Sequence, residues 1–384
     1  MIALTASSLL TPLERIDNPV VLVEDRSIAR VGPREGVSIP SGVRILEFGD
    51  AVLAPGLVDI HIHGGAGHDI MEANPEALPC VERLLFRHGI TSYLPTTITA
   101  PVDATLSSLE RLADAIEREG DQHERARPAG IHLEGPFLSH ARRGVHPPEN
   151  LLEPTVAMFN RFWDASRGHV KMITIAPEVN GALEVIREAA KRGVLVSLGH
   201  SDAGFEIAKA GVDAGARHAT HTFNAMRPMA HRNPGILELV LSDDRISADI
   251  IVDGFHVDPS VVKLFMRAKT AERAVLITDA LAATGMPEGK YRLGAMEFEV
   301  KDGKCTSGGT IAGSVLTMDQ AVRNVMKFTG FDFQQALRTA TLNPARAAGL
   351  PGQRGRLEAG AAADLVVFNH RQEVVRTIVG GRGI

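Results

Sequence analysis

The sequence predicts an α/β fold: a (β/α)8 TIM-like barrel joined to a small β-sandwich domain built from both ends of the chain. Two patterns predict it. Short apolar runs alternate with amphipathic helical stretches through the middle of the chain, whereas both ends contain short strands without helical periodicity. Because chain ends often lie close together, we expect residues 1–53 and 346–384 to form the sandwich and residues 54–345 the barrel.

The middle of the chain contains the strand-like runs of the predicted barrel. Helical stretches such as residues 102–119, 182–192 and 261–269 lie between them, each with its apolar residues on one face. Eight parallel strands with alternating helices are what closes such a barrel. The predicted strands are residues 57–63, 91–97, 130–134, 170–176, 194–200, 218–222, 247–252 and 274–279.

The two ends of the chain share the same sequence pattern. Residues 20–25 and 43–48 near the start, and 363–368 and 374–379 near the end, read as strands separated by proline and glycine. These segments are expected to pair in one sandwich. The remaining expected elements are a β insertion near residues 291–306 and helices at residues 318–329 and 333–341.

Composition is that of an ordinary globular protein. The chain has 384 residues, of which 44% are hydrophobic and 23% charged, and a net charge of 41 − 46 = −5. It has no basic run, which argues against nucleic acid as a partner, although a small anionic substrate remains compatible. Cys80 and Cys305 have no spacing partners, so neither a disulfide framework nor a cysteine metal site is expected. No convincing signal peptide or membrane span is found, and we expect a cytoplasmic enzyme.

Metal-competent side chains stand at the ends of several predicted barrel strands. Residues i and i+2 of a strand point to the same face, so His61 and His63 leave one surface together. The ends of barrel strands meet at one face, where active sites of this fold lie. The sequence therefore predicts a metal centre there, with six candidate residues: His61, His63, Glu134, His200, His221 and Asp279.

Several neighbouring polar residues have structural explanations. His132 is expected deeper in the barrel, as a core histidine or a support for the ligands. His218 lies three residues from His221 and so faces the other way, which favours a structural role. Ser201 or Asp202 suits a helix cap better than catalysis, and Asp253 suits a turn at a strand end.

Asp279 is the natural general base, because it is a carboxylate that ends an apolar strand. His146, His256 and Arg232 lie in polar loops, where spacing alone leaves a surface role and a functional role equally open. The glycine-rich segment 307–314 either lets the backbone approach a ligand or forms an ordinary turn.

These motifs resemble the N-acetylglucosamine-6-phosphate deacetylase family of the amidohydrolase superfamily. They follow the family's order from Pro55 to Ala345. His-Leu-Glu-Gly-Pro and His-x-x-Asn-Ala-Met are highly specific, whereas His-x-His and Thr-Asp-Ala belong to the wider superfamily. The motifs are Pro-Gly-x-x-Asp-x-His-x-His-Gly (55–64), His-Leu-Glu-Gly-Pro-Phe (132–137), Gly-His-Ser-Asp-Ala (199–203), Thr-His-x-x-Asn-Ala-Met (220–226), Asp-Gly-x-His (253–256), Thr-Asp-Ala (278–280) and Asn-Pro-Ala (343–345).

The resemblance implies a role for each matched position. Glu134, His200 and His221 match the shared metal ligands, and His61 and His63 match a pair that holds a second ion in some members. Asp279 matches the catalytic aspartate, and His146 a histidine near the acetamide. Arg232 matches an arginine that reaches a neighbouring subunit's site. The implied substrate-binding positions are Val145, Asn224, Ala225, Arg232, His256, Ile311, Ala312 and Gly313. Thr222-Phe223 departs from members that carry a tyrosine there, which bears on sugar contacts.

The implied activity is hydrolysis of the acetamide of N-acetyl-D-glucosamine 6-phosphate to D-glucosamine 6-phosphate and acetate, in amino-sugar catabolism. One or two divalent ions per subunit are implied, Zn²⁺ first, with Fe²⁺, Co²⁺ or Mn²⁺ as alternatives. A homodimer is expected. The alternatives are a deacetylase for the galactosamine epimer, another amidohydrolase, or a binding protein on the same fold. A ring opener would place a carboxylated lysine at the end of the fourth strand, but Lys171 stands at its start.

Overall fold

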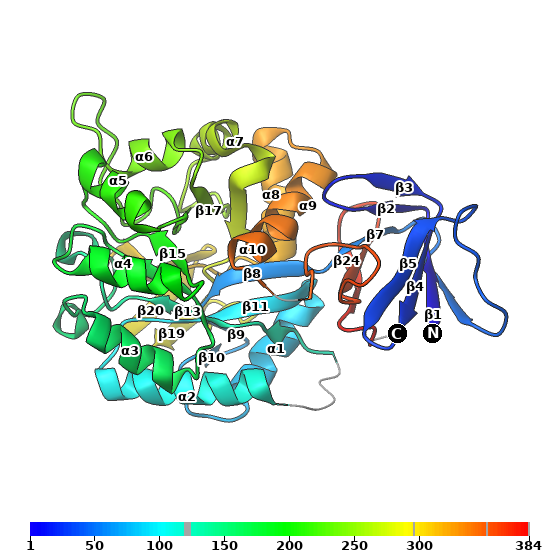
Figure 1. Cartoon of the computed structure of the whole chain (residues 1–384), viewed down its shortest axis with the longest axis horizontal. Coiled ribbons are helices and arrows are strands. Elements are labelled where there is room, and N and C mark those ends of the chain that lie inside the picture. Colours follow the sequence, from blue (N-terminus) through cyan, green and yellow to red (C-terminus); the bar gives the residue numbers. More distant parts are fainter. Residues whose placement is uncertain (119–123, 295, 351, 383–384) are drawn as a thin grey trace.

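The computed structural model describes residues 1–118, 124–294, 296–350 and 352–382 and contains the predicted (β/α)8 barrel. Its eight parallel strands run in the order β8-β11-β13-β14-β15-β16-β17-β18. The ring closes where Ile62, at the end of β8, bridges Ala280, just after β18. Figure 1 shows helices on the outside of this barrel and a separate β lobe at its side.

The barrel strands are buried on both faces, as parallel strands covered by helices must be. Every residue of β8, β11, β13, β15 and β18 is buried, although β8, β11 and β13 also contain polar residues. The strands are β8 (Leu57–Ile62), β11 (Ile90–Thr97), β13 (Ile131–Glu134), β14 (Val170–Ile175), β15 (Leu195–Leu198), β16 (His218–Ala219), β17 (Ser247–Ile251) and β18 (Ala274–Ile277).

A helix follows each barrel strand, and its apolar face packs on the barrel. The helices are α1 (Ala77–Arg87), α2 (Val102–Glu117), α3 (Val156–Ala165), α4 (Ala182–Lys191), α5 (Phe205–Ala214), α6 (Ile236–Ser242), α7 (Pro259–Arg273), α8 (Met318–Thr329), α9 (Phe333–Ala340) and α10 (Leu342–Ala347). Of the expected helix at 102–119, residue 119 lies outside the described residues. Short additions near the barrel are β9 (Gly64–Gly65), β10 (His68–Asp69), β12 (Arg127–Pro128), η1 (His140–Arg142) and η2 (Pro148–Asn150).

Three predicted strands end two or three residues before their expected ends. The runs 194–200, 218–222 and 274–279 keep strand geometry only over β15, β16 and β18, because the chain turns sharply after them. His200, His221 and Asp279 have positive φ angles of 47°, 31° and 48°, which a strand cannot contain. Because of these turns, both histidines lie beyond the ends of the strands, at the rim of the barrel.

Strands from both chain ends form two sheets that pack face to face. One sheet has the order β5-β4-β1-β6 and the other β24-β23-β7-β2-β3. Leu4, Val21, Leu53 and Val367 belong to the shared apolar layer between them. These strands are β1 (Ile2–Thr5), β2 (Ser8–Leu10), β3 (Arg15–Asp17), β4 (Pro19–Glu24), β5 (Ser27–Pro33), β6 (Arg44–Glu47), β7 (Val52–Pro55), β23 (Leu365–Phe368) and β24 (Val374–Ile378).

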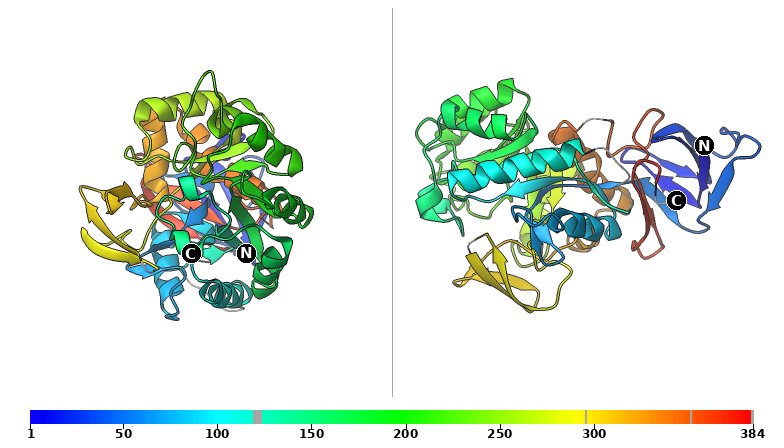
Figure 2. Two further views of the ribbon diagram at one scale, coloured as in Figure 1. Left: turned by 90° about the vertical axis from the view of Figure 1, so that its left-hand side faces the viewer. Right: turned by 90° about the horizontal axis from the view of Figure 1, so that it is seen from below.

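The predicted β insertion follows the last barrel strand as a small antiparallel sheet, β19-β20-β21-β22, which Figure 2 shows projecting from the barrel. Its strands are β19 (Gly289–Leu293), β20 (Met296–Lys301), β21 (Lys304–Ser307) and β22 (Thr310–Ile311). Leu293, Phe298 and Cys305 pack with Ile98 and Leu281 of the barrel rim. This packing fixes the insertion beside the strand ends.

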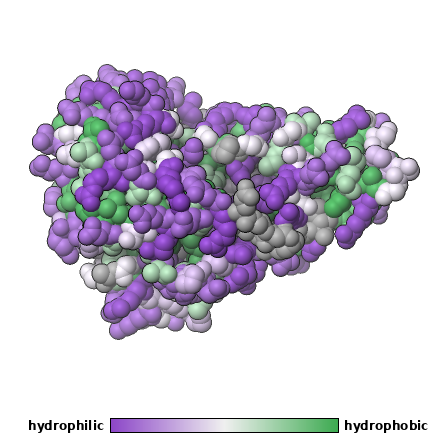
Figure 3. Space-filling model, turned by 60° about the horizontal axis from the view of Figure 1, so that its bottom comes forward, coloured by the Kyte–Doolittle hydropathy of each residue, from purple (hydrophilic) through white to green (hydrophobic). Residues whose placement is uncertain are grey.

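The outer surface is mainly polar on the face shown in Figure 3, where the wide barrel lobe narrows towards the sandwich. Only small apolar patches interrupt the hydrophilic residues there. None of the described helices combines the length and the apolar character that a membrane-spanning segment needs.

Candidate metal centre and active site

The predicted site residues gather around one cavity of about 430 Å³ at the carboxyl ends of the barrel strands. Two of them do not line it: His61 is fully buried beneath it, and Arg232 lies on an exposed loop. The predicted residues that line the cavity are His63, Glu134, Val145, His146, His200, His221, Asn224, Ala225, His256, Asp279, Ile311, Ala312 and Gly313.

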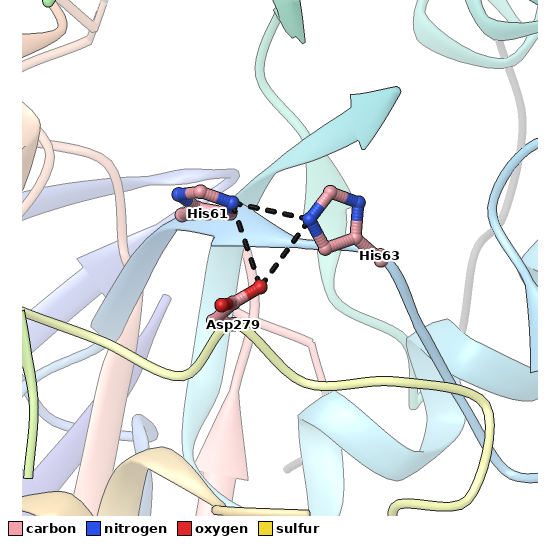
Figure 4. A group of neighbouring side chains, drawn as sticks. All are labelled: His61, His63 and Asp279. Carbon is pink, nitrogen blue, oxygen red and sulfur yellow. Dashed lines mark hydrogen bonds and ion pairs between the residues drawn. The ribbon is translucent and has the colours of Figure 1, made fainter. Parts of the chain in front are cut away.

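The first ligand group consists of His61, His63 and Asp279 (Figure 4). His61 lies on β8 and His63 directly after it, whereas Asp279 follows β18. The Nε2 atoms of the histidines are 3.1 Å apart. Asp279 Oδ1 lies 3.5 Å from His61 Nε2 and 3.3 Å from His63 Nε2. All three side chains are buried and point towards one another.

The second ligand group consists of Glu134, His200 and His221. Glu134 ends β13, and the histidines come two residues after β15 and β16. Glu134 Oε1 lies 3.2 Å from His200 Nε2 and 3.0 Å from His221 Nε2, and the two nitrogens are 3.0 Å apart. The three atoms come from separate barrel strands.

Glu134 joins the two groups into one centre. Its Oε2 lies 3.1 Å from His63 Nε2, while its Oε1 faces the second group. Bonds of about 2.0–2.2 Å to a tetrahedral ion place ligand atoms about 3.3 Å apart, close to these separations. Imidazole nitrogens and carboxylate oxygens are also the donors that first-row divalent ions prefer. The residues therefore fit a metal ion, and a second ion has donors of its own in the first group.

Two of the histidines are held in the tautomer that metal binding requires. Nδ1 of His63 lies 3.1 Å from the Thr96 carbonyl, and Nδ1 of His200 lies 2.9 Å from the Arg142 carbonyl. A carbonyl only accepts, so in the neutral ring the proton is on Nδ1 and the lone pair on Nε2. These bonds aim the Nε2 lone pairs into the centre.

Buried aspartates hold the backbone on both sides of the centre. Asp59 accepts from the backbone N–H groups of His61 and Thr278 and from the Thr278 hydroxyl, which ties β8 to β18. Asp249 accepts from the backbone N–H of His221 and lies 2.9 Å from His218 Nε2. These contacts fix the positions from which the ligands project.

Electrostatics keeps the two site carboxylates ionised. Burial alone raises the pKa of Glu134, but the charge of His61 and hydrogen bonds from His146, His200 and His221 outweigh it and hold this pKa well below its usual range. Burial likewise raises the pKa of Asp279, yet His61 and His63 lower it overall. Both carboxylates are therefore available as metal ligands or proton acceptors at neutral pH.

His146 is a neutral donor beside the centre. Burial, the largest effect, lowers the pKa of His146 to about 4. Nδ1 lies 2.7 Å from the Thr99 hydroxyl and accepts from the Thr99 backbone N–H at 3.4 Å, which favours the proton on Nε2, 3.5 Å from Glu134 Oε2. A neutral imidazole N–H at this position can stabilise an oxygen that becomes negative.

The remaining lining residues form the other walls of the cavity. Nδ1 of His256 donates to Asp253 Oδ2 over 2.7 Å, and Asp253 also accepts from the Phe255 backbone, as a turn residue does. The segment 310–313 comes from the β insertion. Gly313 is required there because a Cβ would lie 2.8 Å from the Asp279 carbonyl oxygen, and its φ is +49°.

The residues for which structural roles were expected lie outside the cavity lining. His132 is fully buried, with Nε2 2.8 Å from the Thr174 hydroxyl, and its ring contacts His61 edge to face. His218 lies between Ser247 and Asp249. Lys171 stands near the start of β14, away from the strand ends.

Sequence reasoning missed Arg142, Asp59 and Asp249. Arg142 lines the cavity and supplies the carbonyl that binds His200, but nothing in its loop sequence marks it. Asp59 and Asp249 carried a usable signal: each is an aspartate inside an apolar strand, and a buried carboxylate needs partners.

The chain matches known proteins over nearly its whole length. Residues 52–384 match the amidohydrolase family. The chain is 36% identical to the N-acetylgalactosamine-6-phosphate deacetylase of Escherichia coli O157:H7, covering 99% of this chain and 98% of that protein. It is 37% identical to the N-acetylglucosamine-6-phosphate deacetylase of Lysinibacillus sphaericus, covering 89% and 87%.

Solved structures share the whole architecture. A mutant of the Mycobacterium smegmatis N-acetyl-D-glucosamine-6-phosphate deacetylase, in complex with N-acetyl-D-glucosamine-6-phosphate, superposes with a TM-score of 0.92 at 36% identity and covers 99% of this chain and 98% of that one. The N-acetylglucosamine-6-phosphate deacetylase of Thermotoga maritima has a TM-score of 0.87 at 32% identity, with coverage of 98% and 97%. The overall fold of this chain is thus common to these proteins.

Proposed function

The chain belongs to the amidohydrolase family, and from that premise we propose that it hydrolyses the acetamide of N-acetyl-D-glucosamine 6-phosphate to D-glucosamine 6-phosphate and acetate. One observation carries the proposal: Glu134 lies between the two histidine pairs, with Asp279 at the edge of a cavity that can hold a small substrate. Such a centre is suited to attack of water on an amide carbonyl.

Glu134, His200 and His221 would hold the primary ion, and His61 and His63, with Asp279, a second one. We propose Zn²⁺ as the ion, with Fe²⁺, Co²⁺ and Mn²⁺ as alternatives that the same donors accept. When bound, the ion supplies Lewis-acid polarisation of the acetamide carbonyl and lowers the pKa of water at the site.

Asp279 moves the proton in both steps. As the water oxygen attacks the acetamide carbon, the Asp279 carboxylate takes the water proton. His146 donates its Nε2–H to the oxygen that becomes negative. Asp279 then returns the proton to the nitrogen, the C–N bond breaks, and acetate and a free amine leave. Without that proton the nitrogen would depart as an amide anion, which neutral pH does not permit.

The remaining predicted residues would bind the substrate. His256, Asn224, the backbone at Ala225 and the segment Ile311–Gly313 face the cavity and are proposed to contact the sugar and its phosphate. Arg232 is exposed and outside its own chain's cavity, as expected if it serves a neighbouring subunit. We therefore propose a homodimer, which analytical ultracentrifugation tests.

The galactosamine epimer is the second candidate substrate. Its support is the Escherichia coli O157:H7 N-acetylgalactosamine-6-phosphate deacetylase, which at 36% identity is about as similar as the N-acetylglucosamine-6-phosphate deacetylase of Lysinibacillus sphaericus at 37%. A panel of both N-acetylhexosamines, each with and without the 6-phosphate, tests both proposals by acetate release from metal-loaded enzyme. We expect turnover of a phosphorylated epimer that a chelator abolishes and added metal restores. Absence of acetate from all four compounds with fully loaded protein contradicts the proposed function.

A further inference from the structure

Arg142 places a positively charged side chain at the cavity of its own chain. Among the described residues that line the cavity, it is the one lysine or arginine. Its Nε donates to Asp202 Oδ1 over 2.8 Å, and its side chain is 32% exposed. Neither Nη atom has a hydrogen-bond partner within the part of the chain that the structure describes. The guanidinium is thus held at one edge and open at the other.

The position of Arg142 follows from two backbone contacts with the metal centre. The Ser139 N–H donates to the His200 carbonyl over 3.0 Å, and His200 Nδ1 donates to the Arg142 carbonyl over 2.9 Å. These bonds bracket the short helix η1 and attach it to the residue that carries one proposed ligand. Arg142 therefore keeps a fixed place relative to the second ligand group.

Backbone hydrogen bonds connect the loop that holds Arg142 to the segment where the phosphate is proposed to bind. Ser201 N–H donates to the Ala225 carbonyl over 3.0 Å, and Arg227 N–H donates to the Ser201 carbonyl over 2.9 Å. Asp202, which holds Arg142, is the residue after Ser201. The guanidinium and the Asn224-Ala225 backbone therefore belong to the same side of the cavity, where both are lining groups.

We propose that Arg142 binds the phosphate of the substrate through its Nη groups. The assignment rests on the proposed function and adds a phosphate-binding residue to it. A guanidinium offers parallel N–H donors that match two phosphate oxygens, and Asp202 keeps this fork oriented before the substrate arrives. Because Arg232 lies outside the cavity of its own chain, Arg142 is the residue that gives each cavity a cation of its own.

The test compares phosphorylated and unphosphorylated substrate in matched variants. Arg142→Gln removes the charge, Arg142→Lys keeps the charge without the fork, and Arg143→Gln makes the same charge change at the neighbouring residue, which does not line the cavity. The readout is the ratio of kcat/KM for N-acetylglucosamine 6-phosphate to that for N-acetylglucosamine. We expect Arg142→Gln to lower this ratio by about 10–100-fold, the loss of a charge-assisted hydrogen bond. Arg142→Lys should recover part of the ratio, and Arg143→Gln should keep it.

Metal content measured on each variant separates phosphate binding from support of His200. An unchanged ratio in Arg142→Gln, or an equal fall for both substrates together with loss of metal, overturns the assignment. If the wild-type enzyme deacetylates neither compound, the proposed function fails, and calorimetry then tests the phosphate site alone. Metal-loaded wild type should bind glucosamine 6-phosphate more tightly than glucosamine, and Arg142→Gln should lose that preference. Equal preference in both proteins overturns the assignment.

Discussion

The two ligand groups are built differently although they face the same cavity. In the first group, His61 and His63 come from the end of one regular strand, and their spacing alone brings them together. In the second group, every ligand comes from a different strand, and two of the three, His200 and His221, have left-handed backbone conformations, whereas in the first group only Asp279 does. Such conformations cost about 1–3 kcal/mol each and persist because surrounding contacts hold them.

The contacts that hold the second group come from distant parts of the chain. His221 depends on Asp249, and His200 on the Arg142 carbonyl and on the loop of Ser201, whose hydroxyl donates to Glu178. In the first group, Asp59 supports His61 from two residues away, but it also accepts from Thr278, 219 positions away, and His63 depends on the Thr96 carbonyl, 33 positions away. Both groups therefore depend on distant contacts, and they differ in that the second group takes each of its three ligands from a separate strand.

The largest expected effect is loss of metal from the second group. His200→Ala or His221→Ala should remove the bound ion and the activity together, because each supplies one of few protein ligands. Metal analysis and acetate release on the purified variants measure both. His370→Ala, an exposed histidine of the sandwich lobe, is the control. Full metal content in either variant would contradict the assignment of that residue.

Asp279→Asn should lose turnover while it keeps the fold and at least one ion. The amide is nearly isosteric but cannot accept the water proton or carry it to nitrogen. General acid–base assistance is worth about 10²–10⁴-fold, and we expect a fall in kcat at the upper end because one group serves both steps. Asp302→Asn, in the exposed β20–β21 turn, is the matched control.

Two outcomes would change the role of Asp279. A near-native kcat with full metal content would exclude it as the proton shuttle. Loss of all metal would make it a primary ligand, and the first ligand group would then hold the essential ion, which reverses the proposed order of the two groups.

A smaller effect is expected when the first group is disabled. The double variant His61→Ala, His63→Ala should keep one ion per subunit and measurable turnover, since Glu134, His200 and His221 remain. Metal stoichiometry by mass spectrometry, compared with His200→Ala, ranks the two groups directly. Complete loss of both ion and activity would show that His61 and His63 hold the primary ion.

The contrast between the groups also explains what the sequence could predict. His61 and His63 follow from strand periodicity, and Glu134, His200, His221 and Asp279 from the end of an apolar run. The barrel was predictable for the same reason, since its buried strands stand out as apolar segments.

What supports the ligands was not predictable, because it depends on contacts between distant residues. Arg142 is 58 positions in sequence from His200 and 60 from Asp202, both of which it contacts. Asp249 is 28 positions from His221. No local pattern encodes such pairs. The sharp turns at His200 and His221, which shorten β15 and β16, depend on these same contacts.

The smallest expected effect is on stability. It follows from comparing the carboxylates of the centre with a carboxylate that is buried elsewhere. The histidines of the centre reverse the effect of burial on Glu134 and Asp279. Glu82 on α1 has no such cluster: burial, the largest effect, raises its pKa to about 7 despite Arg125 and the Tyr93 hydroxyl. Because its folded-state pKa lies above the unfolded value of 4.5, Glu82 contributes stability below about pH 4.5 that is lost as the pH rises through 7.

Glu82→Gln should therefore flatten the pH dependence of stability between pH 5 and pH 8. The wild type should lose on the order of 2 kcal/mol of unfolding free energy over this range through this one group, and the variant should not. Urea denaturation at both pH values measures the difference, with Glu110→Gln on the exposed side of α2 as control. Activity should be unaffected, since Glu82 lies outside the cavity lining. An equal loss of stability in variant and wild type would show that Glu82 is already ionised at pH 5, and that a carboxylate buried outside the centre needs no histidine cluster to keep its charge.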